Sequence, residues 1–248
     1  MKISIITVTK NSEGTIRDTL DSINQQSYPD IEHIVVDSKS TDSTLELIDK
    51  HGTRVTKLLS ENDKSIYDGL NKGINMSSGD IIGFLHSDDT FAHNNVIKNI
   101  AYEFQTNNID AVYGNLDYVS KKNTNKIIRR WVSGEYSRFN LRNGWMPPHP
   151  TFYMKRKYYL SLGSFNLKFN ISADYESILR YLWKNKLDAT YIPDTLVKMK
   201  VGGESNRSLT NILKKMIEDR DALKMNKIPV TRAIIGKNFS KLKQFYIR

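Results

Sequence analysis

Residues 79–89 read Gly79-Asp80-Ile81-Ile82-Gly83-Phe84-Leu85-His86-Ser87-Asp88-Asp89, a short apolar run that ends in two adjacent aspartates. A continuous apolar run of this length is typical of a strand buried on both faces of a sheet. Ligands of open α/β sheets bind beyond the carboxyl ends of the strands. The stretch therefore predicts a parallel strand over Ile81–Leu85 with a polar site directly after it.

Strand-like and helix-like segments alternate on the N-terminal side of this run. The expected strands are Ile3–Val8, Ile31–Val36 and Val55–Leu59. The expected helices lie between the strands, and the last of them covers Ile66–Ile74. This alternation predicts βαβ units, and hence an α/β fold whose mainly parallel sheet carries helices on both faces.

The pattern changes after about residue 110. Four short strands (Ala111–Tyr113, Leu116–Val119, Ala189–Ile192, Leu196–Val201) and helices over Ala173–Trp183 and Ser208–Met225 are expected, and Pro229 precedes a last helix. We therefore expect one compact domain over residues 1–205. It comprises a nucleotide-binding half (1–115) and an acceptor-facing half (116–205), and a basic helical C-terminal extension (206–248) follows.

The composition is that of a soluble globular protein, with 39% hydrophobic and 26% charged residues among 248. The chain has no cysteine, which excludes a disulfide or a thiolate zinc site. The N-terminal apolar run is too short to span a membrane, and Lys10 and Asn11 end it without the small-residue cleavage site of a signal peptide. These features predict a cytoplasmic protein.

The net charge of +10 is concentrated near the C-terminus. Residues 204–248 contain eleven Lys or Arg against four Asp or Glu, which gives +7. Phe239, Leu242, Phe245 and Tyr246 are interleaved with the last basic residues. Such a segment suits the anionic inner face of the cell membrane, although a solvated helix end has the same composition.

Acidic residues follow several of the expected strands. Asp88 and Asp89 form a hard oxygen site suited to Mg²⁺ or Mn²⁺, but the same pair could merely open a turn and cap a helix from Phe91 onward. Asp37 can be a turn residue, or a carboxylate that accepts a hydrogen bond from a base or ribose. Carboxylates that meet in one crevice need a cation or hydrogen-bond donors.

Four ordered blocks resemble the family 2 glycosyltransferases, which are inverting enzymes with the GT-A (Rossmann-like) fold. The blocks are Ile5-Ile6-Thr7-Val8-Thr9-Lys10-Asn11, Ile34-Val35-Val36-Asp37-Ser38-Lys39-Ser40-Thr41-Asp42-Ser43-Thr44, residues 60–73 with the triplet Asn71-Lys72-Gly73, and residues 79–89. The resemblance is specific over the first 90 residues and continues more weakly to about residue 205.

The resemblance implies roles for particular residues. It implies nucleotide binding by Thr7, Asn11, Asp37, Asp63, Lys72 and Asp88. Asp88 matches the metal aspartate of the family's Asp-x-Asp motif, and Asp89 is the acidic residue after it. His86 stands where the first aspartate of that motif usually lies, so the site carries less negative charge than is usual.

The second half supplies the expected base. Ile171-Ser172-Ala173-Asp174-Tyr175-Glu176 resembles the family's acidic pair at a helix start, which makes Asp174 the candidate base and Glu176 the second choice. No Lys or Arg stands beside Asp174 in the sequence, which favours an unpaired carboxylate. His149, held between prolines, is a candidate for positioning the acceptor or the diphosphate, and His86 is another.

The resulting expectation is an inverting transfer from a nucleoside-diphosphate sugar, by default a UDP-sugar, to a hydroxyl of a glycan or lipid-linked acceptor in surface polysaccharide synthesis. A divalent ion, Mg²⁺ or Mn²⁺, neutralises the leaving diphosphate. Two alternatives stay open: a sugar nucleotidyltransferase, and a non-enzymatic basic protein that binds nucleic acid. The cluster of strand-end carboxylates argues against a nucleic-acid partner.

Overall fold

The structure is a computed structural model that describes residues 1–202 and 209–243, with side chains up to Gly202 and from Thr210 to Lys237. The strands are β1 (Ile3–Thr9), β2 (Ile31–Asp37), β3 (Val55–Ser60), β4 (Ile81–Phe84), β5 (Asp89–Phe91), β6 (Ala111–Val119), β7 (Ile127–Trp131), β8 (Tyr153–Lys155) and β9 (Ala189–Lys200). The helices are α1 (Ile16–Asn24), α2 (Thr44–His51), α3 (Ile66–Met76), α4 (Val96–Thr106), α5 (Arg138–Arg142), α6 (Arg156–Leu162), α7 (Ala173–Ile178), α8 (Leu209–Met225) and α9 (Val230–Lys243). Two short helical turns, η1 (His149–Thr151) and η2 (Leu179–Lys184), complete the elements.

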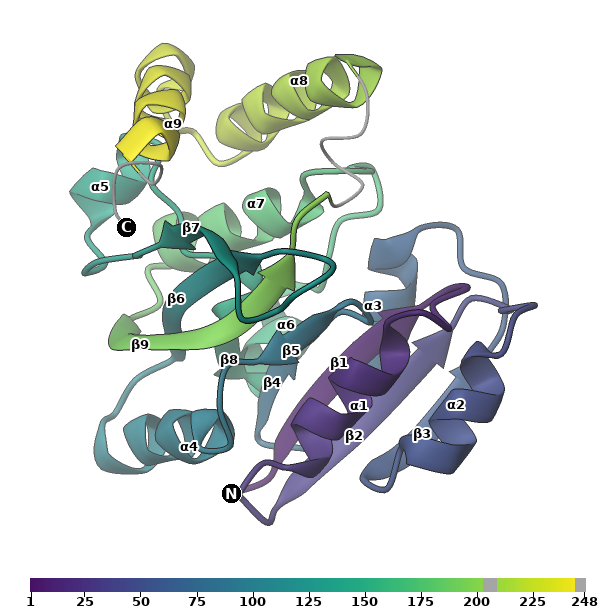
Figure 1. The fold of residues 1–248 in the computed structure, drawn as a ribbon. Coiled ribbons are helices and arrows are strands. Elements are labelled where there is room, and N and C mark those ends of the chain that lie inside the picture. Colours follow the sequence, from purple (N-terminus) through teal and green to yellow (C-terminus); the bar gives the residue numbers. More distant parts are fainter. Residues whose placement is uncertain (203–208, 244–248) are drawn as a thin grey trace.

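Within these residues the strands form one mixed, mainly parallel sheet in the order β3-β2-β1-β4-β8-β6-β9-β5, with β7 paired to β6 (Figure 1). Strands β1 to β4 are parallel, and their register aligns Thr9 with Asp37 and Ile6 with Phe84. The carboxyl ends of β1, β2 and β4 therefore meet at one edge, where the sequence predicts the site.

Helices cover both faces of the parallel strands, as predicted. Successive side chains of β1 point to opposite faces of the sheet, and the apolar ones on each face pack against helices. Ile5 belongs to the core that α1 and α4 complete, whereas Ile6 and Val8 belong to the core that α3 completes. Helix α3 packs very closely on β1, since a Cβ on Gly73 would lie 2.4 Å from Cγ2 of Ile6.

The second half departs from the expected element boundaries. Residues 111–119 form one strand, β6, whose pairing with β9 is irregular around Asn115, and residues 189–200 form one strand, β9, that runs through Pro193. The helix expected over Ala173–Trp183 changes to π-helical geometry at Leu179. The division expected at residue 115 falls inside β6.

The C-terminal helices confirm the predicted helical extension. Helices α8 and α9 lie against each other and α8 packs on α7, at the end of the molecule opposite α2 and α4 (Figure 1). In the described part of the chain no helix is both long and apolar enough to cross a membrane. The boundary expected after residue 205 and the aromatic residues 239–246 lie outside the described side chains.

Candidate active site

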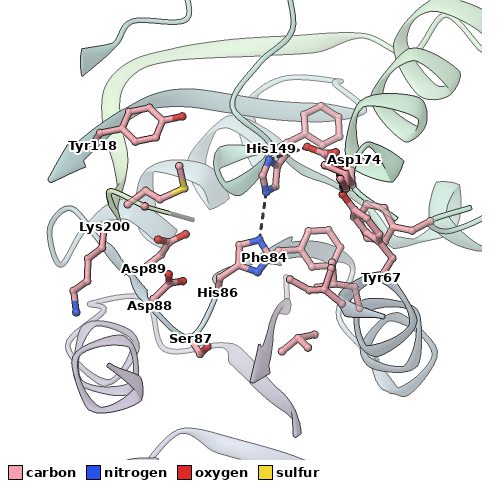
Figure 2. A pocket seen from close by; sticks show the side chains of 18 of the residues that line it. Tyr67, Phe84, His86, Ser87, Asp88, Asp89, Tyr118, His149, Asp174 and Lys200 are labelled. Carbon is pink, nitrogen blue, oxygen red and sulfur yellow. Dashed lines mark hydrogen bonds and ion pairs between the residues drawn. The ribbon is translucent and has the colours of Figure 1, made fainter. Parts of the chain in front are cut away.

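A cavity of about 1730 Å³ lies beyond the carboxyl ends of the parallel strands, and both halves of the chain line it (Figure 2). Its lining includes these predicted site residues: Asn11, Asp63, His86, Asp88, Asp89, His149 and Asp174. Side chains of α8 and α9 close the far wall. Residues that are distant in sequence thus meet in one chamber.

Asp88 and Asp89 follow β4, and Asp89 begins the short strand β5, which pairs with β9. The alternative of a helix from Phe91 is wrong, because α4 begins only at Val96. Asp89 is 1% exposed, and neither of its carboxylate oxygens has a hydrogen-bond partner among the described residues. Burial, and then the neighbouring charge of Asp88, raises the pKa of Asp89.

These two carboxylates fit a divalent cation. A buried carboxylate without partners is unfavourable unless it is protonated or a positive charge lies beside it. Lys200 supplies only part of that charge. Its amine pairs with Asp18 at 2.7 Å, and its backbone N–H and its charge lower the pKa of Asp89 less than burial and Asp88 raise it. The described residues contain no cluster of three or more metal-ligating side chains, but Mg²⁺ is commonly held by one or two carboxylates together with substrate phosphates.

Asp174 stands at the start of α7 and is not the unpaired carboxylate that the sequence predicts. Its Oδ2 lies 3.0 Å from Nδ1 of His149, and its Oδ1 accepts a hydrogen bond of 3.1 Å from the Tyr67 hydroxyl. Burial raises the pKa of Asp174, but the charge and hydrogen bond of His149, with Lys215 and Lys237, outweigh it and hold the pKa well below its usual range. The carboxylate is therefore ionised at neutral pH.

His86 and His149 link the two groups of carboxylates. Their Nε2 atoms are 3.3 Å apart, so one ring donates a hydrogen bond to the other, and in Figure 2 the pair lies between Asp88 and Asp174. Burial, followed by the charge of His149, lowers the pKa of His86 to about 4. His86 is thus neutral at physiological pH, and its Nδ1 is buried without a partner among the described residues.

Asp63 reaches the cavity after β3. Its Oδ1 accepts a hydrogen bond of 2.6 Å from Lys72, whereas its Oδ2 is buried and has no partner in the described part of the chain. Lys72 also pairs with Glu61 at 2.9 Å, and the hydrogen bonds to Asp63 and Glu61 raise the pKa of Lys72. Lys72 is not in the cavity lining. In this structure its amine pairs with Asp63 behind the cavity lining, and the nucleotide contact that the resemblance implies for Lys72 stays a prediction.

Two further predicted nucleotide contacts lie behind the cavity wall. Asp37 is fully buried, and its carboxylate accepts hydrogen bonds from Ser60 at 2.7 Å, from the backbone N–H of Ser40 at 3.0 Å and from the Ser40 hydroxyl. Thr7 is fully buried and lies 3.1 Å from Nε2 of His33. Their polar atoms are satisfied by the protein. Asp37 holds Ser40, whose hydroxyl in turn accepts a hydrogen bond of 2.8 Å from the backbone N–H of Asn11, whereas Thr7 joins β1 to β2.

Glu176, the second choice for the base, is excluded by its surroundings. It is 1% exposed, lies outside the cavity lining, and accepts hydrogen bonds of 3.1 Å from both Nε and one terminal nitrogen of Arg180. The same guanidinium donates to the carbonyl groups of Leu162, Gly163 and Ser164. Glu176 therefore anchors a loop, and Asp174 is the acidic residue of this helix that reaches the cavity.

The sequence does not reveal the role of Tyr67. This residue lies on α3, and its apolar neighbours indicate only a core position. Its hydroxyl donates at 2.7 Å to the carbonyl of Ile171 as well as to Asp174, so the first half of the chain fixes the candidate base of the second half. No pattern in the sequence signals a contact across more than one hundred residues.

Sequence comparisons identify relatives of this chain. The model of the family "Glycosyl transferase family 2" matches residues 4–166. A PGL/p-HBAD biosynthesis glycosyltransferase of Mycobacterium bovis is 27% identical over 208 residues, which cover 82% of this chain and 78% of the relative. The UDP-Glc:alpha-D-GlcNAc-diphosphoundecaprenol beta-1,3-glucosyltransferase WfgD of Escherichia coli is 30% identical over 139 residues, 56% of this chain and 53% of that protein.

Solved structures share the fold at low sequence identity. TarS 1–349 of S. aureus in complex with UDP-GlcNAc matches with a TM-score of 0.72 and 18% identity, over 99% of this chain and 72% of that one. The mannosyltransferase PcManGT of Pyrobaculum calidifontis, in complex with GDP-Man and Mn²⁺, matches with a TM-score of 0.64 and 16% identity, over 100% of this chain and 76% of that one.

Proposed function

The chain belongs to glycosyl transferase family 2, and from this membership we propose that it transfers a sugar from a UDP-sugar to a hydroxyl of a lipid-linked or surface glycan, with inversion at the anomeric carbon. The observation that carries the proposal is the single cavity that holds Asp88 and Asp89 on one side of the histidine pair and Asp174 on the other. The relative WfgD, named as a glucosyltransferase that uses UDP-Glc and a diphosphoundecaprenol acceptor, and the fold neighbour TarS, solved with UDP-GlcNAc, support this choice of donor and acceptor.

At the donor side, Asp88 and Asp89 are the residues that would hold Mg²⁺ or Mn²⁺. The ion would supply positive charge to neutralise the leaving nucleoside diphosphate. The partnerless oxygens of Asp89 and a fold neighbour with Mn²⁺ support this assignment. Asn11 and the free oxygen of Asp63 line the same side and are suited to hydrogen bonds with the nucleoside.

At the acceptor side, Asp174 acts as the general base. The acceptor oxygen forms a bond to the anomeric carbon, the bond from that carbon to the diphosphate breaks, and the acceptor proton passes to the Asp174 carboxylate. His149 holds this carboxylate ionised, and the hydrogen bond from Tyr67 helps to orient it. Base assistance of this kind contributes roughly 10²–10⁴-fold to a rate.

The two alternatives from the sequence have no support in these findings. The family match describes a glycosyltransferase, so the nucleotidyltransferase alternative is not retained. A nucleic-acid role leaves the carboxylates of the cavity without a purpose, because acidic residues repel phosphates in the absence of a cation.

A donor screen tests the proposal. Purified protein is incubated with Mn²⁺ and a panel of UDP-, GDP- and dTDP-sugars, with and without a lipid-linked glycan acceptor, and release of nucleoside diphosphate is followed. We expect UDP release that depends on the acceptor and stops when EDTA is added. Release of pyrophosphate from a sugar phosphate and a nucleoside triphosphate, with no UDP release, contradicts the proposal.

A further inference from the structure

Helix α8 has two dissimilar sides. On the inner side, Asn211 and Lys215 line the cavity, and the charge of Lys215 contributes to the low pKa of Asp174. On the outer side, four large apolar residues are exposed to solvent by the following fractions: Ile212 41%, Leu213 61%, Met216 51% and Ile217 59%. The helix therefore separates the cavity from an apolar surface.

The four exposed residues form one continuous stripe. They occupy positions i, i+1, i+4 and i+5, which at 3.6 residues per turn fall within an arc of about 140° on the helix. Single exposed apolar residues are common on protein surfaces, but a contiguous apolar patch marks a site of interaction with a protein or a membrane. The outer face of α8, residues 212, 213, 216 and 217, is thus a candidate interaction surface.

The charges around the stripe indicate which occupant fits. Lys214, Arg220 and Lys224 are exposed on α8, whereas Asp221 is the one exposed acidic residue among the described side chains of this helix. The other acidic residues of α8 are used inside the protein. Glu218 accepts hydrogen bonds from the backbone of Asn170, Ile171 and Ser172, and Asp219 pairs with Lys237 at 2.8 Å.

We propose that the outer face of α8 is a docking surface for an anionic lipid bilayer. Interfacial helices bury an apolar face at the boundary of the acyl chains while basic residues contact anionic headgroups. A second copy of the chain fits less well, because a two-fold contact through this face places the basic residues of both copies together.

The position of α8 connects this surface to the proposed reaction, and in this respect the inference rests on the proposed lipid-linked acceptor. A helix with its side chains is about 10 Å across. A bilayer against the outer face of α8 is therefore close to the cavity wall formed by Asn211 and Lys215. The glycan of an acceptor whose lipid stays in the bilayer then has only a short distance to cover.

Vesicle flotation with the full-length chain tests the docking surface. The wild type, the triple variant Leu213→Gln/Met216→Gln/Ile217→Gln and a control triple variant, Leu58→Gln/Tyr102→Gln/Leu160→Gln, are mixed with vesicles of phosphatidylcholine alone or with phosphatidylglycerol. The control residues are exposed by 47%, 62% and 52% on other elements, so both variants remove similar apolar surface. We expect the α8 variant to lose at least tenfold in binding to anionic vesicles and the control to bind as the wild type does.

A charge variant separates the two contributions. Arg220→Glu/Lys224→Glu keeps the apolar stripe and should lose the preference for phosphatidylglycerol. Equal binding by the wild type and the α8 triple variant overturns the proposal, as does a wild type that floats with neither vesicle. A wild-type dimer that the triple variant converts to a monomer, without vesicle binding, assigns the face to a second copy. Because flotation needs no catalysis, these outcomes are independent of the donor screen.

Discussion

The donor end of the cavity (Asp63, Asp88, Asp89) and its acceptor end (Asp174, His149, Tyr67) hold carboxylates in opposite electrostatic settings. At the donor end, burial raises the pKa of Asp89, and oxygens of Asp63 and Asp89 lack partners among the described residues. At the acceptor end, both oxygens of Asp174 have partners, and its pKa lies well below the usual range despite burial.

This contrast shows which part of the site the protein completes by itself. The acceptor end is preorganised, because His149 and Tyr67 fix the carboxylate before any substrate arrives. The donor end contains buried carboxylate oxygens without hydrogen-bond partners among the described residues, which protonation, a bound cation or a bound nucleotide would satisfy. Ligands should therefore stabilise the protein through the donor end. Substitutions at the acceptor end should lower turnover, whereas substitutions at the donor end should lower the response to metal and nucleotide.

The largest expected effect is that of Asp174→Asn at the acceptor end. The amide cannot take the acceptor proton, so kcat should fall by about 10²–10⁴-fold. Calorimetric binding of UDP with Mn²⁺ should persist, because Asp174 lies across the histidine pair from Asp88 (Figure 2). Asp194→Asn, at an exposed pair with His93 outside the cavity, is the control. Turnover within twofold of the wild type would remove Asp174 from the reaction.

The next effect is that of Asp89→Asn at the donor end. The variant removes a buried charge without partners, so the metal-free protein should gain about 1–3 kcal/mol in stability, while Mn²⁺-dependent kcat/KM should fall roughly 10²-fold. The pKa of Asp89 is higher in the folded than in the unfolded protein. The unfolded state therefore ionises first, and the stability of the wild type should fall as the pH rises above the unfolded pKa of about 4.

Thermal unfolding with and without Mn²⁺ and UDP checks this prediction. The ligands should raise the midpoint of the wild type and leave that of Asp89→Asn nearly unchanged, because the ligands no longer relieve a buried charge. A variant that is less stable than the wild type in metal-free buffer, and that still responds to Mn²⁺, would show that the donor end is already complete in the protein.

The third effect is that of His149→Gln, which removes the largest influence that lowers the pKa of Asp174. Burial then dominates, and the carboxyl pKa rises. The acidic limb of log kcat against pH should shift to higher pH. In addition, kcat at neutral pH should fall by roughly tenfold, because the carboxylate is less well oriented. An unchanged acidic limb would mean that His149 does not govern the base.

Unfolding measurements test whether the interaction of His149 with the Asp174 carboxylate stabilises the folded protein. A carboxyl whose folded pKa is depressed adds stability above the unfolded pKa of about 4 and loses it as the pH falls further. The wild type should therefore be more stable than His149→Gln at neutral pH. The difference should close as the pH falls below about 4. Pro148→Ala, which leaves the imidazole in place, is the control.

The difference between the ends also explains what the sequence could reveal. Donor-end residues follow parallel strands, so the apolar run and the two aspartates of residues 81–89 predict both the strand and the site. Acceptor-end residues lie on a loop and a helix whose approach depends on packing over long distances. No periodic pattern in the sequence signals the contact of Tyr67 with Asp174 or the pairing of His86 with His149.

One inference about charge was wrong for a physical reason. Neighbours in sequence predict an isolated Asp174, yet folding pairs it with His149. The resemblance implies nucleotide binding by Lys72, which stays a prediction; in the structure its amine pairs with Asp63. The sequence predicts separate strands on either side of residues 114–115 and 193–195, and Gly114 and Pro193, which lie in these gaps, are of types that weaken strands. The sheet absorbs them through irregular pairing between β6 and β9.

The smallest expected effect is that of Lys72→Met, which tests whether the donor end is positioned from behind. Without the amine, both oxygens of Asp63 lack a strong partner, so the KM for the donor should rise a few-fold while kcat changes little. Lys72 also joins Glu61 and Asp68, and its loss leaves three carboxylates close together. The unfolding midpoint should therefore fall by roughly 2–4 °C, as expected for about 1 kcal/mol in a chain of this size.

Arg17→Met is the matched control for Lys72→Met, because Arg17 pairs with Asp21 at 3.6 Å on an exposed surface. Exposed pairs contribute little, so this change should shift neither KM nor the midpoint measurably. If Lys72→Met behaves like the control, Asp63 is held by its backbone alone, and the donor end is more rigid than its unpaired oxygens indicate. If kcat falls as well as donor affinity, Lys72 contacts the reacting diphosphate, and the division between a supporting lysine and a substrate-facing carboxylate is wrong.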